Sequence, residues 1–223
     1  MPLVQWGLRE LIMKKKEVFE RTSEKTGITS KIPTATAAEP IKDGAIIEKI
    51  KTALNKKKTM KYYALFCTGI NVGLRISDLL VLRVYEAKQT HIKNIREKKT
   101  GKGKSFPINR ALRAVLDIYI KEFDLKDNDY LFFTNKKDKS KDKQHIDPSQ
   151  AYRKLKSVIK SVAPDIHVST HTLRKTFGYW LYQQTKDVVL VMHALNHSSI
   201  ATTMRYIGLT QESIDLAVND LNL

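Results

Sequence analysis

Apolar residues recur every three to four positions along most of this 223-residue chain, separated by polar and charged residues. That spacing places the apolar side chains on one face of a helix, so it predicts a succession of amphipathic helices. Capping and turn residues set the expected limits of each helix. We expect helices at residues 3–26, 43–57, 59–70, 109–123, 147–162, 172–184, 186–195, 199–206 and 211–221.

A further short helix is expected directly after Gly73, with Ser77 and Asp78 as its capping residues. It would turn Leu79 inward and leave Arg75 just ahead of its first turn. The helix dipole disfavours a cation at that position unless an anion binds there as well. Arg75 is therefore a candidate phosphate ligand.

The helical period is lost between residues 90 and 108. The stretch 90–97 alternates loosely, the stretch 105–108 reads as extended, and the glycine-containing segment 98–104 between them is typical of a turn. We expect a β-hairpin with a cationic tip, although a solvated charge run is the more common outcome for such a sequence. The whole pattern predicts a mainly α fold with a small antiparallel sheet, of the α+β class.

Residues 29–40 have the composition of a linker, with two prolines among small and polar residues. We place a boundary near Pro40, so that residues 1–40 form an N-terminal helix and linker and residues 41–223 form the main domain. The last predicted helix, within residues 210–223, has a narrow apolar stripe that would fold back onto its own core or dock elsewhere.

The 40 Lys and Arg residues outnumber the 23 Asp and Glu residues, which gives a formal net charge of +17. Proteins that neutralise phosphates carry such an excess, so nucleic acid is the leading partner class. A merely basic, soluble surface is the alternative, because charge alone does not separate the two.

The single cysteine, Cys67, lies in an apolar run and cannot form an intramolecular disulfide. We expect a buried, inert thiol in a reducing compartment. No apolar run approaches the roughly 20 residues that a bilayer span requires, and we expect no membrane association and a cytoplasmic location. The chain also lacks the Cys and His spacing of a metal site, so we expect no metal and no cofactor.

One group of residues is suited to attacking a phosphodiester: Arg75, His171, Arg174, His197 and Tyr206. Such an attack needs a nucleophile, charge stabilisation on the phosphoryl oxygens, and groups that move protons. A tyrosine with an ordinary pKa of about 10 needs help to lose its proton. Two arginines supply permanently charged donors for one phosphate, and a histidine can accept or relay a proton.

Helical spacing places His171 and Arg174 on one face of their helix, and we expect both to face outward. Asn196 follows the preceding helix where a left-handed residue would end it, and it would present His197 at a fixed place. Each of these residues alone has an ordinary structural explanation, as a satisfied polar residue or a member of the core. Their joint occurrence is what favours a site.

The same motifs closely resemble those of the tyrosine recombinase (phage integrase) family, in family order, from about residue 41 to the C-terminus. The resemblance rests on Gly73-Leu-Arg75-Ile-Ser-Asp78, Lys99-Thr-Gly eight positions before Pro107, His171-Thr-Leu-Arg174, Leu195-Asn-His197-Ser-Ser, and Tyr206 nine positions after His197. It implies a mostly helical catalytic domain that cleaves one DNA strand at a time through a 3′-phosphotyrosine.

The resemblance also implies a role for each matching residue. Tyr206 would be the nucleophile, His171 would handle its proton, and Lys99 would be the general acid. Lys98 and Lys102 lie close enough in sequence to be alternatives for the general acid. The spacing to Pro107 favours Lys99. The phosphate would be held by Arg75, Arg174 and His197. The remaining expected roles are support of Arg75 by Asp78 and DNA contacts by Lys98, Lys102 and Lys104.

The chain departs from the family pattern in three places. Asn196 replaces the usual glycine and Lys175 the common second histidine, and we expect neither to touch the chemistry. Only residues 1–40 precede the catalytic region, where family members usually carry about a hundred residues of DNA-clamping domain. In this respect the chain resembles the small invertases of the family or a fragment of a longer chain.

In the family a terminal helix docks on a neighbouring subunit, which implies a tetramer on two DNA sites.

The sequence thus favours a site-specific DNA recombinase, acting on double-stranded DNA in integration, excision or inversion. A DNA-binding regulator that keeps the fold without recombining DNA is the alternative, and a relaxing topoisomerase is a third possibility. The complete set of catalytic residue types favours the recombinase, because a protein that no longer cleaves DNA would be free to lose at least one of them.

Overall fold

The computed structural model describes residues 38–94, 104–134 and 144–209, together with Asn219. The chain divides by its internal contacts into Met1–Ala37 and Ala38–Leu223, and every described residue belongs to the second unit. The predicted helix at 3–26, the hairpin tip at 98–103 and the predicted C-terminal helix, apart from Asn219, lie outside the described residues. Within the described ranges, no helix is both long enough and apolar enough for a bilayer span.

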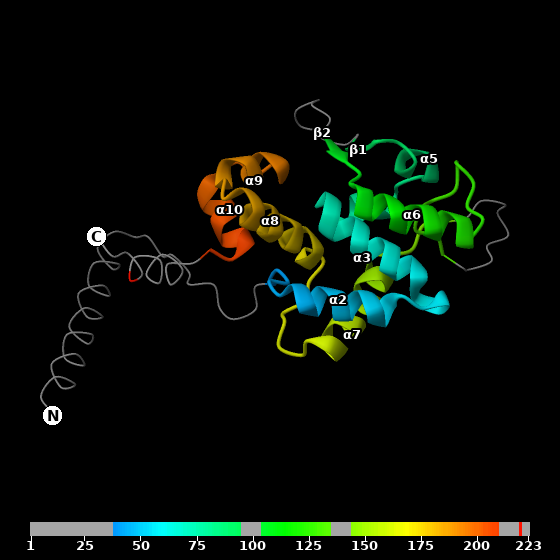
Figure 1. Ribbon diagram of the computed structural model, residues 1–223, viewed down its shortest axis with the longest axis horizontal. Coiled ribbons are helices and arrows are strands. Elements are labelled where there is room, and N and C mark those ends of the chain that lie inside the picture. Colours follow the sequence, from blue (N-terminus) through cyan, green and yellow to red (C-terminus); the bar gives the residue numbers. More distant parts are fainter. Residues whose placement is uncertain (1–37, 95–103, 135–143, 210–218, 220–223) are drawn as a thin grey trace, which may run out of the picture. The chain divides into compact units, whose positions relative to one another are not determined.

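The described part is mainly helical with one two-stranded antiparallel sheet, so the predicted fold class is confirmed (Figure 1). The elements, in chain order, are α2 (Gly44–Leu54), the 3₁₀ helix η1 (Lys57–Thr59), α3 (Met60–Val72), α4 (Ile76–Leu80), α5 (Val84–Ala87), β1 (His91–Asn94), β2 (Lys104–Pro107), α6 (Arg110–Glu122), α7 (Pro148–Val162), α8 (Thr172–Thr185), α9 (Val188–Ala194) and α10 (Ile200–Ile207).

Strands β1 and β2 form the hairpin expected between residues 90 and 108. Ile92 pairs with Phe106, and both side chains are buried, whereas the neighbouring Lys93 and Ser105 are exposed. Alternation of this kind is what fixes a strand register when one face of a sheet is buried. The hairpin therefore packs one face on the helical body.

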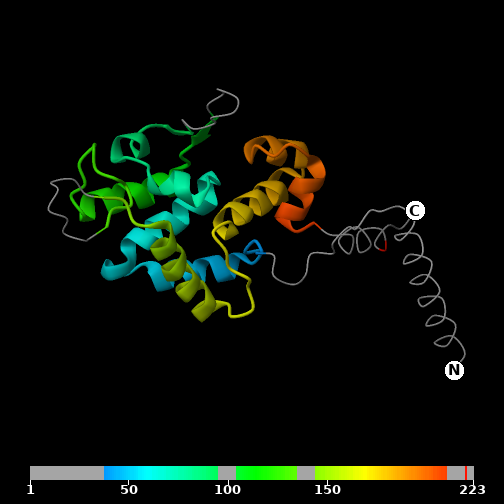
Figure 2. The ribbon, with the colours of Figure 1, turned by 180° about the vertical axis from the view of Figure 1, so that it is seen from behind.

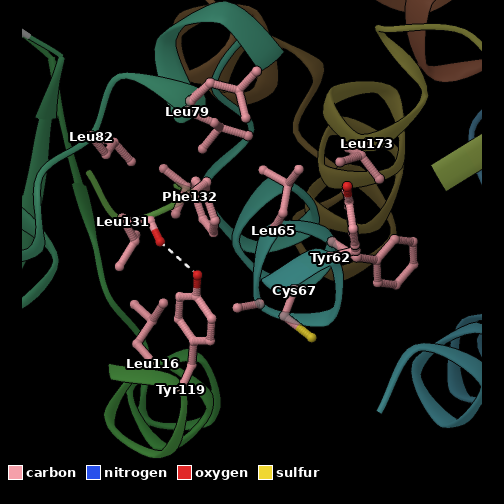
Figure 3. Packing of buried hydrophobic residues seen from close by; sticks show 14 of the residues in the cluster. Tyr62, Leu65, Cys67, Leu79, Leu82, Leu116, Tyr119, Leu131, Phe132 and Leu173 are labelled. Atoms are coloured by element: carbon pink, nitrogen blue, oxygen red, sulfur yellow. Dashed lines mark hydrogen bonds between the residues drawn. The ribbon is translucent and has the colours of Figure 1, made fainter. Parts of the chain in front are cut away.

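The main core is built around α3, which is buried along most of its length (Figure 3). Leu65 and Phe132 pack beside Tyr119, whose hydroxyl donates to the Leu131 carbonyl at 2.8 Å. Burial raises the pKa of Tyr119. Cys67 is 2% exposed, and burial raises the pKa of its thiol to about 11, as expected of a buried and unreactive cysteine.

Helices α8, α9 and α10 form a separate layer that packs against α3 through α8 (Figures 1 and 2). This α8–α10 layer has a small apolar core of its own, formed by Val191, Leu195 and Ile207. The rest of the described elements, α2 to α7 with β1 and β2, are called the α2–α7 body below. The body and the layer thus have distinct apolar clusters.

Close packing joins the body to the layer at two glycines of the α3 region. A Cβ atom on Gly69 would lie 2.5 Å from Cδ1 of Leu173, and one on Gly73 would lie 2.2 Å from Cδ1 of Phe177. Gly73 also ends α3 with a left-handed φ of 68°. No side chain fits at either glycine, because protein interiors are packed without spare volume.

Two predicted helix starts are wrong. Helix α4 begins at Ile76 with Arg75 as its N-cap residue, so Ser77 and Asp78 lie inside the helix and do not cap it. The helix predicted to start at residue 186 begins at Val188, and Asp187 caps it by accepting from two backbone N–H groups. At α4 no side chain caps the first turn, whereas at α9 the Asp187 carboxylate, which prefers this position, makes the capping bonds.

Candidate active site

Tyr206 lies near the end of α10, which is fixed at both ends. Ser199 caps the start of the helix by accepting from the Thr202 N–H at 3.2 Å. Gly208 ends it in the left-handed region, with a φ of 76°. Tyr206 is half-buried, and its aromatic ring is in contact with the two histidines of the predicted site.

His171 stands at the N-cap position of α8, 35 positions before Tyr206, and its Nδ1 lies 3.2 Å from the Tyr206 hydroxyl. The two rings meet edge to face, with centroids 6.3 Å apart. The His171 backbone N–H donates to the Ser169 hydroxyl, which holds the residue at the helix start. This distance allows direct proton transfer between the tyrosine and the histidine.

Burial and three cations act on His171. Burial lowers its pKa most, and the charges of Arg174, Arg75 and Lys175 lower it further. Because the pKa falls below the ordinary value of 6.5, the imidazole is neutral at pH 7 and can accept a proton.

Tyr206 experiences opposing influences on its own pKa. Burial raises the pKa of the phenol, whereas the adjacent Arg174 and the Arg75 charge lower it, and burial prevails. The phenol therefore keeps its proton at neutral pH in the unliganded protein. Attack by Tyr206 requires a base, and His171 is placed to act as one.

Arg174 is buried, with only 5% of its surface exposed, so the expectation that it faces outward with His171 is wrong. Its Nη1 donates to the Gly73 carbonyl at 2.7 Å, and its Nη2 donates to the Leu195 carbonyl. These two bonds connect the end of α3 to the end of α9. Helical spacing alone could not reveal this, because the partners of Arg174 come from elements far along the chain.

His197 is presented by the left-handed turn that the sequence predicted, with a φ of 52° at Asn196. The ring of His197 packs against that of Tyr206 with centroids 4.7 Å apart, and its Nδ1 lies 3.1 Å from the Thr203 hydroxyl. The Thr203 hydroxyl donates its proton to the Ser199 carbonyl at 3.0 Å. It can therefore only accept from His197, which places a hydrogen on Nδ1.

Arg75, the N-cap residue of α4, and Asp78, within α4, lie near the buried guanidinium of Arg174. Their charges act on the pKa of Arg174 in opposite directions, although burial lowers that pKa most. Arg75 is exposed and Asp78 is half-buried. In the described ranges no ion pair joins these two side chains, and Asp78 accepts from the Ser77 hydroxyl at 3.4 Å. Support of Arg75 by Asp78 stays a prediction.

Lys175 contacts the predicted nucleophile, although we expected it to lie outside the chemistry. Its Nζ lies 5.0 Å from the centroid of the Tyr206 ring, and the same atom donates to the Ala38 carbonyl at 2.7 Å. The available signal was its position four residues after His171, one helical turn along the same face.

The predicted cations of the hairpin are placed only in part. Lys98, Lys99 and Lys102 lie outside the described residues. Lys104 belongs to β2, where it pairs with Asn94. Among the side chains of the described ranges, no group of three or more His, Cys, Asp or Glu residues gathers in a way that could hold a metal ion.

The model of the phage integrase family matches residues 43–213. The chain is 38% identical over 175 residues to the probable integrase/recombinase YoeC of Bacillus subtilis (strain 168). This alignment covers 78% of this chain and 92% of YoeC. It is 28% identical over 152 residues to the tyrosine recombinase XerA of Pyrococcus furiosus, covering 68% of this chain and 51% of XerA.

Solved structures show the same fold. The crystal structure of XerA recombinase matches with a TM-score of 0.65 and 19% identity, over 87% of this chain and 68% of that one. The XerH site-specific recombinase bound to its difH substrate, in a pre-cleavage complex, matches with a TM-score of 0.61 and 19% identity, over 84% of this chain and 55% of that one. The chain thus spans about half the length of several of the recombinases it matches.

Proposed function

Because the chain belongs to the phage integrase family, we propose that it cleaves and rejoins DNA strands at specific sites through a covalent bond between Tyr206 and a DNA phosphate. Its relatives named above are tyrosine recombinases and integrases. The observation that carries the proposal is the 3.2 Å approach of His171 Nδ1 to the Tyr206 hydroxyl, which pairs a nucleophile with a base.

In the cleavage step the Tyr206 oxygen attacks the phosphorus and transfers its proton to Nδ1 of His171. A bond forms between that oxygen and phosphorus, and the bond from phosphorus to the 5′-oxygen breaks. The departing 5′-oxygen takes a proton from a general acid, for which the family resemblance proposes Lys99. The products are a 3′-phosphotyrosine and a free 5′-hydroxyl. Rejoining reverses these steps with the 5′-hydroxyl of the same or another strand.

In this proposal Arg75, Arg174 and His197 stabilise the negative charge that develops on the phosphoryl oxygens. Arg174 has five N–H groups and uses two of them on the Gly73 and Leu195 carbonyls. Three remain for the phosphate and the phenol, so one guanidinium serves both packing and binding. His197 can donate to a phosphate oxygen through Nε2 only when it is protonated there, because the Thr203 contact already places a hydrogen on Nδ1.

Double-stranded DNA is the proposed substrate. The net charge of +17 suits it, and the XerH relative was solved with its difH substrate. We assign backbone contacts to the hairpin cations Lys98, Lys102 and Lys104, which would release counterions on binding. We also propose that four copies assemble on two DNA sites, as recombination between two duplexes requires.

The test is a nicked suicide duplex that carries the repeat sequences flanking the gene. The unmodified protein is expected to form a covalent protein–DNA adduct that survives denaturing electrophoresis, and Tyr206→Phe should form none. Tyr182→Phe is the matched control, since it removes a hydroxyl from a tyrosine of α8 that has no place in the proposed mechanism.

The alternative regulator predicts a different result with the same duplexes. Tight, specific binding by the unmodified protein without any adduct would contradict the recombinase proposal and support the regulator. An adduct that persists in Tyr206→Phe would place the nucleophile elsewhere.

A further inference from the structure

The Lys175 side chain connects the predicted nucleophile to the start of the domain. Its Nζ is 2.7 Å from the Ala38 carbonyl and 5.0 Å from the centroid of the Tyr206 ring. The side chain is half-buried, and burial lowers the pKa of its ammonium group while the Glu39 carboxylate opposes this. A lysine held between a carbonyl and an aromatic ring has little rotational freedom.

The segment that Lys175 contacts, residues 38–42, is here called the strap. Backbone groups of the strap form three hydrogen bonds with α8 and with the residues just before it. The Glu39 N–H donates to the His167 carbonyl at 3.0 Å, and the Ile41 N–H donates to the Thr176 hydroxyl at 2.9 Å. The Ile41 carbonyl accepts from the Trp180 indole N–H at 3.0 Å. The bond between Ile41 and Thr176 is buried. The strap is therefore held against α8, the helix whose N-cap residue is His171.

The strap also reaches the end of α10. Nζ of Lys42 donates to the Gly208 carbonyl at 3.3 Å, two residues after Tyr206. A Cβ atom on Gly208 would lie 3.1 Å from Cε of Lys42 and 3.7 Å from Cγ of Pro40. Two lysines, one on α8 and one on the strap, thus hold the strap beside the helix that carries Tyr206.

We propose that Lys175 is a positioning residue for Tyr206, which holds the phenol ring by its ammonium group and ties the orientation of that ring to the strap. The proposal rests on the proposed function, because it takes Tyr206 as the nucleophile. It assigns a role to the residue that stands where the family commonly has a second histidine. It also makes residues 38–42 part of the apparatus that orients the nucleophile.

Two physical effects support this role. An ammonium group about 5 Å from the face of a tyrosine ring attracts it, so the ring loses freedom to swing away from His171. The ammonium charge also lowers the pKa of His171, together with the charges of Arg174 and Arg75. The groups that face His171 are thus Arg174 and Lys175 from α8, Arg75 from the N-cap of α4 and Tyr206 from α10. Lys175 acts on both members of the nucleophile and base pair.

The first test needs neither DNA nor catalysis, so it separates this inference from the proposed function. NMR titration of the His171 imidazole in the full chain is compared between the unmodified protein and Lys175→Met. Removal of the charge should raise the pKa of His171 toward 6.5, whereas Lys175→Arg should leave it in place. Lys156→Met is the matched control, because Nζ of Lys156 lies 5.6 Å from the centroid of the Tyr152 ring on α7. This variant should leave the pKa of His171 unchanged.

The second test measures single-turnover cleavage at saturating DNA. We expect Lys175→Met to slow cleavage about tenfold without weakening DNA binding, and Lys175→Arg to stay within about threefold of the unmodified protein. Lys175→Gln keeps an N–H donor for the Ala38 carbonyl but has no charge, so it should be as slow as Lys175→Met. It also serves as the second variant if thermal melting shows that Lys175→Met is unfolded.

Two results would overturn the proposal. One is an unchanged His171 titration in both folded neutral variants, and the other is Lys175→Gln cleaving at the unmodified rate. If the unmodified protein forms no adduct at all, the titration still decides whether Lys175 acts on the site.

Discussion

The α2–α7 body and the α8–α10 layer are held together in different ways. The interior of the body is an extended apolar cluster centred on α3. Among the described residues, the separate apolar cluster of the layer consists of Val191, Leu195 and Ile207, while Leu173 of α8 belongs to the cluster of the body. Buried polar side chains complete its interior: Thr172, Arg174, Thr176 and Thr203. The body also buries Lys61 and Thr68, but its apolar cluster is far larger, so we expect it to contribute most of the stability, whereas the layer buries polar groups next to Tyr206.

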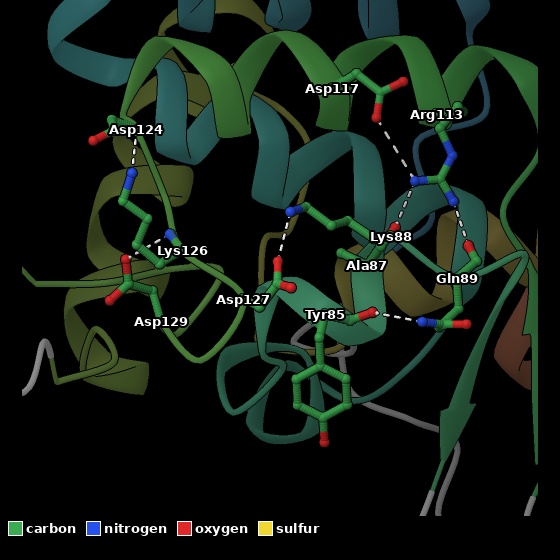
Figure 4. Close-up of polar contacts among 10 residues, drawn as sticks. All are labelled: Tyr85, Ala87, Lys88, Gln89, Arg113, Asp117, Asp124, Lys126, Asp127 and Asp129. Atoms are coloured by element: carbon green, nitrogen blue, oxygen red, sulfur yellow. Dashed lines mark hydrogen bonds and ion pairs between the residues drawn. The ribbon is translucent and has the colours of Figure 1, made fainter.

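Two arginines illustrate the difference. Arg113, in the body, donates to the Ala87 and Gln89 carbonyls and forms an ion pair with Asp117 at 3.7 Å near the surface (Figure 4). Its neighbour Lys88 pairs in the same way with Asp127. Exposed pairs of this kind contribute about 0–1 kcal/mol. Arg174 also donates to two carbonyls, but it is buried beside Tyr206, where loss of its charge affects both packing and chemistry.

The largest effect is expected from Arg174→Met. Loss of the guanidinium should slow DNA cleavage about 10³-fold, because it removes donors to the phosphoryl oxygens. It should also cost about 3 kcal/mol of unfolding free energy, since two buried carbonyls lose their partners. Cleavage kinetics and urea denaturation measure the two effects.

Arg113→Met is the matched control for that variant. It also leaves two carbonyls without an arginine donor, yet it should cost only about 1 kcal/mol and leave cleavage per folded molecule unchanged. Equal kinetic losses in the two variants would show that the body and the layer do not differ in the way described.

The junction between body and layer is tested by Gly73→Ala. The new Cβ would have to share space with Phe177 at 2.2 Å, and alanine is strained at a φ of 68°. We expect a loss of about 3 kcal/mol of unfolding free energy. Gly44→Ala is the control, because its Cβ would meet Trp180 at an ordinary 3.7 Å, and it should change stability by less than about 0.5 kcal/mol. A Gly73→Ala variant as stable as the control would argue against close packing at the junction.

The pH dependence of cleavage tests the environment of His171. The pKa of His171 is lowered below 6.5, so the neutral base is present at pH 7 and is lost as the pH falls through that lowered pKa. Below it, the cleavage rate should fall about tenfold per pH unit, and His171→Gln should remove this dependence. An acidic limb with its midpoint above 6.5 would contradict the arrangement of burial and three cations around the imidazole.

The smallest effect is expected at the turn that presents His197. Asn196 has a φ of 52°, which glycine adopts at lower cost, so Asn196→Gly should stabilise the layer by about 0.5 kcal/mol. Asp124→Gly, with a φ of 45°, is the equivalent change in the body. Thermal melting compares the two. A loss above about 1 kcal/mol at Asn196 alone would mean that its side chain stabilises the turn.

Much of the fold was accessible from local pattern. The hairpin followed from the loss of the helical period and from the glycine-containing segment between two extended stretches, and the left-handed turn at Asn196 followed from the residue types that tolerate such a conformation. Helix starts were less certain, since Arg75 stands at the N-cap of α4 without a side-chain cap and α9 begins two residues later than predicted, after Asp187. Caps depend on which of several polar side chains reaches the free N–H groups, and neighbouring elements influence that choice.

By itself, the sequence determined which chemical groups are available, on which helices they lie, and in what order they follow one another. It did so because helical period, turn residues and capping are properties of a few neighbouring positions. Only the tertiary structure decided that Arg174 is buried against the Gly73 and Leu195 carbonyls, and that Lys175 lies over Tyr206. The two Arg174 bonds join residues 101 and 21 positions apart, and the Lys175 contact joins α8 to α10. They exist only once α8, α9 and α10 have packed together and, for Gly73, once this layer has packed on the body.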